Sequence, residues 1–100
     1  MDSIRVHIVD DHTLFREGLK FLLSTTNYIP HIDESENGLE SILNIANISP
    51  DIVLMDIEMP IMDGITATRQ LMQTYPDLKI IALSMYGYEH YYSQMIDAGA

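Results

Sequence analysis

Cysteine is absent from the 100-residue sequence, and basic residues are scarce. Without cysteine there is neither a disulfide framework nor a thiolate nucleophile, a composition that suits a reducing cytoplasm. The five Lys and Arg residues are outnumbered by fifteen Asp and Glu, so the formal net charge is -10. Because Lys and Arg contacts to phosphate supply most non-specific affinity for nucleic acid, this balance argues against direct binding to DNA or to an anionic membrane.

Long apolar runs are missing as well. No stretch approaches the roughly 20 residues that cross a bilayer, and the start, Met1-Asp2-Ser3, lacks the basic and apolar regions of a signal peptide. We therefore expect a cytoplasmic chain with no membrane partner. Hydrophobic residues make up 47% of the sequence, which is enough for the core of one domain spanning residues 1–100.

Strand-like and helix-like segments alternate along this domain. Apolar strand patterns occur at 4–9, 31–34, 52–55 and 78–83. Helical spacing of apolar residues follows each of them, at 13–24, 39–46, from 63 onward, and at 88–96. This order predicts an α/β fold, a doubly wound parallel sheet with right-handed crossovers and helices on both faces.

Particular residues mark the helices. Asp63 before Gly64 is a predicted N-cap, and Gly99 is a predicted C-cap. One apolar stripe is predicted along the first helix, formed by Phe15, Leu19, Leu22 and Leu23.

Carboxylates follow two of the predicted strands. Asp10 and Asp11 come directly after the first strand, and Asp56 follows the third. A single such Asp could equally be a solvated turn former or a helix cap. The carboxyl ends of parallel strands meet at one sheet edge, where ligands of α/β proteins bind. Three acids gathered there repel one another unless a cation holds them or their pKa values rise. The pattern therefore predicts a hard divalent cation.

Four sequence motifs resemble a known family. They are VDDH at 9–12, LFREGL at 14–19, DIEMPIMDG at 56–64 and ALSM at 82–85. In this order and spacing they resemble a response-regulator receiver domain of the NarL/FixJ type, whose members usually carry a C-terminal LuxR-type helix-turn-helix. The resemblance implies a flavodoxin-like sheet with strand order 2-1-3-4.

The resemblance also implies roles for individual residues. Asp56 matches the aspartate that accepts a phosphoryl group from a sensor histidine kinase. Asp11 matches the direct Mg²⁺ ligand, Asp10 the acid that binds the metal through water, and Glu58 the residue whose backbone carbonyl completes the coordination. Ser84 matches the hydroxyl that moves toward the phosphoryl group when the domain switches.

Receivers of this family continue with a fifth strand, which bears a switch aromatic and a lysine, and a fifth helix. The sequence ends at Ala100 and offers no equivalent lysine, since Lys20 and Lys79 lie at other positions. We therefore expect a (βα)₄ piece of a longer regulator, which would contact DNA only through an absent C-terminal domain. The fourth-strand edge or the first-helix face would then be open to self-association.

Two other functions stay open. The missing lysine favours a phosphorylation-deficient pseudo-receiver that acts as a protein-interaction module. A Mg²⁺-dependent hydrolase with Asp56 as nucleophile is less well supported, because Asp56-Ile57-Glu58 lacks the second Asp of haloacid-dehalogenase-like phosphatases. If the chain is a receiver, it is a regulator. It would catalyse only its own phosphorylation and dephosphorylation and would not otherwise be an enzyme.

Histidines and tyrosines carry weaker signals. No pair of histidines has metal-ligand spacing, so all four are predicted to be structural or solvent-facing: His7, His12, His31 and His90. Tyrosines gather near the start of the last helix, where two interpretations are equally supported: a stripe half buried on the sheet or a partner surface. These tyrosines are Tyr86, Tyr88, Tyr91 and Tyr92.

Overall fold

Strands and helices alternate throughout the computed structural model, which describes residues 4–26, 31–83 and 89–100. In these ranges the elements are β1 (Arg5–Val9), α1 (Thr13–Ser24), β2 (His31–Ser35), α2 (Gly38–Ile48), β3 (Ile52–Asp56), α3 (Gly64–Thr74), β4 (Lys79–Leu83) and α4 (Glu89–Ala98). The predicted alternation is confirmed, and the bounds of α1 are those expected from its sequence pattern.

The strands form one parallel sheet in the order β2-β1-β3-β4, as predicted. β1 lies between β2 and β3, and its register with β3 sets Val9 opposite Met55. β3 pairs on its other side with β4, where Asp56 lies opposite Leu83. The carboxyl ends of β1, β3 and β4 therefore lie together at one edge of the sheet.

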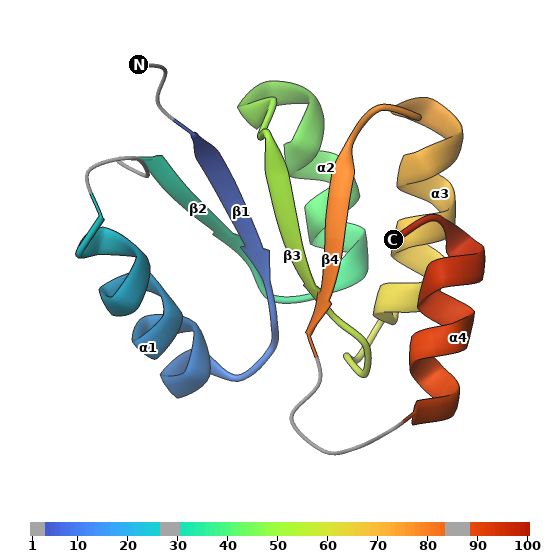
Figure 1. Cartoon of the computed structure of the whole chain (residues 1–100), viewed down its shortest axis with the longest axis horizontal. Helices are drawn as coiled ribbons and strands as arrows, with labels where there is room; N and C mark the ends of the chain where they lie inside the picture. The colour runs from blue at the N-terminus through green and yellow to red at the C-terminus, as the bar shows by residue number, and fades with distance from the viewer. Residues whose placement is uncertain (1–3, 27–30, 84–88) are drawn as a thin grey trace.

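The sheet separates two layers of helices (Figure 1). α2, α3 and α4 cover one face, while α1 lies on the other. The main core fills the space between the sheet and the three helices, where strand and helix residues bury each other: Val9, Ile45, Val53, Met55, Ile57, Ala67, Leu71, Ile80 and Met95. β1 is buried from Val6 to Val9, in agreement with its continuous apolar pattern.

The apolar residues of α1 are poorly buried. Leu22 of the predicted apolar stripe is 64% exposed, and Leu14 and Phe21 are also exposed. The buried residue of α1 is Arg16. α1 lies without a neighbouring helix on its side of the sheet in the described part of the chain, so much of its apolar surface remains in water. No helix in the described ranges has the length and apolar character to cross a membrane.

Backbone and cap contacts fix the loops at the carboxyl edge. The Asp63 side chain accepts a hydrogen bond from the Thr66 N–H at 2.7 Å, which confirms it as the N-cap of α3. The Gly64 N–H donates to the Ile57 carbonyl at 2.8 Å and ties the end of that loop to the residue after β3. At the far end of the chain Gly99 has φ +120° and ends α4, as predicted.

Candidate functional site

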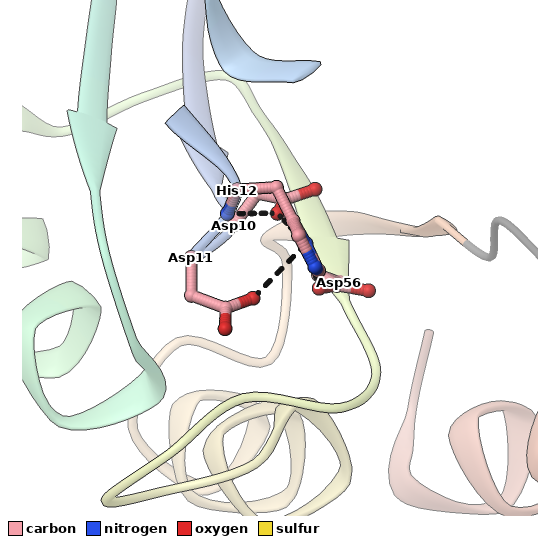
Figure 2. Close-up of side chains that lie close together, drawn as sticks. All are labelled: Asp10, Asp11, His12 and Asp56. Carbon is pink, nitrogen blue, oxygen red and sulfur yellow. Dashed lines mark hydrogen bonds and ion pairs between the residues drawn. The ribbon is translucent and has the colours of Figure 1, made fainter. Parts of the chain in front are cut away.

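Three acids and one histidine lie close together where β1 and β3 end (Figure 2). Asp10 directly follows β1, and Asp56 is the last residue of the adjacent β3. One ligand atom each from Asp10, Asp11, His12 and Asp56 lies within 4.8 Å of all the others. The predicted convergence of the acids is confirmed, because the parallel pairing of β1 with β3 brings both strand ends to the same edge.

Asp10 and Asp11 offer oxygen atoms to a ligand. Asp10 is fully buried, and its Oδ1 accepts from the His12 backbone N–H at 2.8 Å. Its Oδ2 is buried without a hydrogen-bond partner among the described residues, and the buried Oδ1 of Asp11 makes no hydrogen bond there but lies 3.2 Å from Nδ1 of His12. Burying polar oxygens without partners is costly. Such an atom in an acidic cluster fits a hard cation such as Mg²⁺, which prefers carboxylate oxygens and retains several waters.

The environment of Asp56 disfavours its charge. Its side chain is 11% exposed. Burial, followed by the nearby charge of Asp10, raises the pKa of Asp56 to about 6, although the Ile57 N–H donates to its Oδ1 at 2.8 Å and acts in the opposite direction. A cation in the cluster would offset this repulsion and favour the carboxylate form.

His12 also belongs to the cluster. Its side chain is 57% exposed, which confirms the prediction of a solvent-facing histidine, but its contacts with the acids were not predicted. Its Nδ1 lies 3.0 Å from Asp10 Oδ1, 3.2 Å from Asp11 Oδ1 and 4.0 Å from Asp56 Oδ2. The hydrogen bond to Asp10, followed by the charge of Asp11, raises the pKa of His12. The signal for these contacts in the sequence is the position of His12 directly after two acids at a strand end.

The structure describes only some of the other residues that were predicted to belong to the site. Glu58 is exposed in the loop after β3, and its carbonyl role stays a prediction. Ser84 lies outside the described residues, but Leu83 before it pairs with Asp56, so β4 ends beside the cluster. Lys79 begins β4 at the opposite sheet edge, and Lys20 binds Glu34 at 2.9 Å. Neither lysine therefore lies where a lysine could serve the cluster, as expected.

The remaining histidines and the tyrosine cluster lie away from the acids or outside the described residues. His7 is buried in β1, its Nε2 lies 2.7 Å from Ser35 Oγ, and burial lowers its pKa. This confirms a structural role, and His31 is exposed at the start of β2. The side chains of His90 and of the four tyrosines near it lie outside the described residues.

Comparison with known proteins identifies the class to which this sheet and acid cluster belong. The family model for the response regulator receiver domain matches residues 6–100, so the chain belongs to that family. Receiver domains of this family are signalling modules rather than classical enzymes, and they typically bind Mg²⁺ at an acidic pocket.

Its relatives are response regulators of the NarL/LuxR type. The chain is 38% identical over 99 residues to "Transcriptional regulatory protein DegU" of Brevibacillus brevis, covering 99% of this chain and 42% of that protein. The chain therefore spans less than half the length of this relative.

Solved structures agree with the fold. A LuxR-family two-component response regulator from Aurantimonas sp. SI85-9A1 superposes with a TM-score of 0.92 at 29% identity, over 99% of this chain and 71% of that one. The signal receiver domain of the putative response regulator NarL from Mycobacterium tuberculosis gives 0.89 at 29% identity, over 100% and 81%. The predicted flavodoxin-like receiver fold is confirmed.

Proposed function

We propose that this chain is a phosphoacceptor receiver that takes a phosphoryl group from a sensor histidine kinase onto Asp56. An Asp56 oxygen attacks the phosphorus, and the bond from phosphorus to the kinase histidine breaks. The observation that carries the proposal is the position of Asp56, nearly buried at the end of β3 and close to Asp10 and Asp11, with Oδ2 of Asp10 buried and free of any hydrogen-bond partner among the described residues. Family membership supports the same assignment.

The acids around Asp56 would hold Mg²⁺. Asp11 would bind it directly, Asp10 through water, Asp56 through its carboxylate, and Glu58 through its backbone carbonyl. Bound there, Mg²⁺ supplies positive charge that cancels repulsion between the carboxylate and the incoming phosphoryl group. The side chain of Asp10 is held at the end of β1 by the His12 N–H, so its oxygens need little rearrangement to serve as ligands.

In this proposal the product is a changed surface rather than a released compound. Ser84 would move toward the phosphoryl group and transmit the change. The module would act in the cytoplasm and catalyse only its own phosphorylation and dephosphorylation. Any contact with DNA would come from a separate domain, because the charge of -10 opposes direct binding.

Phosphorylation tests the proposal directly. We expect incubation with a small-molecule phosphodonor and Mg²⁺ to add about 80 Da, one phosphoryl group. Mass spectrometry should place it on Asp56. Replacing Asp56 with Asn should abolish the product, while Asp51→Asn, which changes an exposed acid at the opposite sheet edge, should not.

A specific observation keeps the pseudo-receiver as a second candidate. The structure describes no lysine side chain near the acid cluster, since Lys20 is engaged with Glu34 and Lys79 lies at the far sheet edge. The domain would then bind partners without accepting phosphate. Binding of Mg²⁺ without any phosphorylated product would favour this candidate over the first.

We further propose that copies of this chain associate through the β4 edge or the α1 face. In the described sheet β4 pairs with β3 alone, and Ile81 in β4 is 51% exposed. Open strand edges with apolar side chains are templates for pairing with a second chain. Leu14, Phe21 and Leu22 expose further apolar surface on α1.

Sedimentation velocity over a concentration series tests this association. We expect a reversible dimer that strengthens as salt is added, because salt screens the repulsion between two chains of charge -10. Ile81→Lys should weaken pairing through β4, and Leu22→Glu should weaken pairing through α1. A wild-type monomer at every concentration and salt level would contradict the proposal.

A further inference from the structure

Arg16 is the buried residue of α1, and its guanidinium contacts two segments, the turn after β1 and the end of β2 with the residue that follows it. One terminal nitrogen donates to the backbone carbonyl of Asp10. Nε donates to Oε1 of Glu34 at 2.9 Å, and the other terminal nitrogen lies 3.8 Å from Oε1 of Glu36. The Arg16 side chain is 8% exposed, so its contacts with Asp10 and Glu34 are largely shielded from water, whereas Glu36 is 67% exposed. A buried guanidinium with this many acceptors is held in one orientation.

The hydrogen bond from Arg16 to the Asp10 carbonyl fixes the Asp10–Asp11 peptide, which follows β1. The Asp10 N–H donates to the Ser35 carbonyl at 3.1 Å and continues the pairing of β1 with β2. Its carbonyl accepts from Arg16, so the backbone of Asp10 is held from both sides. The plane of the Asp10–Asp11 peptide sets the direction in which the Asp11 side chain leaves the chain.

We propose that Arg16 is a positioning residue for the acid cluster, which holds the Asp10–Asp11 peptide so that the oxygens of both acids lie beside Asp56. This inference rests on the proposed function, in which these acids bind Mg²⁺. Arg16 contacts a backbone carbonyl and no carboxylate of the cluster, so its place is compatible with a bound cation. Groups that orient metal ligands in this way commonly matter almost as much as the ligands.

A purely structural role is the alternative, since Arg16 also attaches α1 to β2 through Glu34. A variant of Lys20 can distinguish the two roles. The Nζ of Lys20 lies 2.9 Å from the other Glu34 oxygen, Oε2, and 3.6 Å from Glu17. Lys20 thus shares an acidic partner and a helix with Arg16, but within the described residues it makes no hydrogen bond or ion pair with Asp10. Lys20→Met is therefore a matched control with the same loss of charge.

The experiment measures Mg²⁺ affinity and unfolding in the same variants. Amide resonances of residues 10–12 and 56 are followed by NMR during a Mg²⁺ titration, and urea unfolding is recorded in EDTA. We expect Arg16→Met to weaken Mg²⁺ binding about tenfold or more, as loss of an orienting group does. Arg16→Lys should recover part of the affinity, because a lysine amine can reach the Asp10 carbonyl but cannot bind that carbonyl and Glu34 at the same time as a guanidinium does. Lys20→Met should leave the affinity within about twofold of wild type.

Each outcome decides one question. If Arg16→Met lowers stability but binds Mg²⁺ as tightly as wild type, the role is structural and the inference is overturned. An equal loss of affinity in Lys20→Met also overturns it, because charge alone would then explain the effect. If Arg16→Met does not fold, the comparison of Arg16→Lys with Lys20→Met decides in the same way. Failure of the wild type to bind Mg²⁺ would instead remove the proposed metal site, and the inference with it.

Discussion

Replacing Asp56 with Asn is expected to stabilise the metal-free protein at about pH 7.5 by about 1–3 kcal/mol. Burial and the charge of Asp10 raise the pKa of Asp56 from 3.8 to about 6, so its ionised form is destabilised in the folded state. Asn keeps the shape of the side chain and carries no charge. Its carbonyl oxygen can still accept the hydrogen bond from the Ile57 N–H. The variant that cannot accept phosphate should thus be the more stable protein.

The gain should depend on pH in a defined direction. Well below the unfolded pKa of 3.8, the carboxyl is protonated in both the folded and the unfolded chain, so the substitution should have little effect. Between the unfolded pKa of 3.8 and the folded pKa of about 6, the folded state binds more protons, and wild-type stability falls as pH rises. The difference between variant and wild type should grow through this window and level off above it.

Urea unfolding of both proteins in EDTA across this range measures the difference. His7, whose pKa is lowered by burial, gives a slope of opposite sign, since its stabilising contribution is lost as pH falls. That contribution is common to both proteins and cancels in the comparison. Addition of Mg²⁺ at neutral pH should stabilise the wild type more than the variant. A difference that is constant with pH would refute the electrostatic explanation.

Replacing Gly64 with Ala should destabilise the protein by about 3 kcal/mol or more, because the added methyl group overpacks a rigid site. A Cβ at Gly64 would overlap the backbone carbonyl oxygen of Asp56 and would lie 3.1 Å from the Cα of Ile57. These are backbone atoms, fixed by strand pairing and by the Gly64 N–H bond to the Ile57 carbonyl. The loop cannot yield without moving Asp56.

Gly18→Ala is the matched control. Gly18 lies within α1, and a Cβ there would meet no other atom within 4 Å. The same substitution should therefore stabilise the protein by about 0.5–1 kcal/mol, the usual gain of Ala over Gly inside a helix. Chemical unfolding of the two variants provides the comparison, and equal effects at both sites would contradict the steric argument.

Local patterns were sufficient to predict most of the fold. β1 and β3 have continuous apolar stretches because they lie inside the sheet, and such strands are recognised without knowledge of their neighbours. The N-cap Asp63 and the C-cap Gly99 are also local signals, since each satisfies or permits a conformation of its own helix end. The convergence of Asp10 with Asp56 followed from parallel pairing alone.

The contacts of His12 and Arg16 could not be predicted in this way. A histidine after two acids has several structural interpretations, and only the turn after β1 shows that its Nδ1 faces Asp10 and Asp11. Arg16 lies one residue from Phe15 in a helix whose leucines suggested an apolar buried side. Its actual partners are separated from it by 18 residues at Glu34 and by 6 at Asp10, and neither spacing is a helical pattern.

The sequence by itself determined the alternation of strands and helices and the acids at the strand ends, because periodicity and chain order specify these features, while the sheet order was implied only by the resemblance of its motifs to the receiver family. Only the tertiary structure decided that Oδ2 of Asp10 is buried without a hydrogen-bond partner, how far burial raises the pKa of Asp56, and that a buried arginine donates to the backbone carbonyl between the two acids. These properties depend on distances between residues far apart in the chain, and such distances exist only after folding.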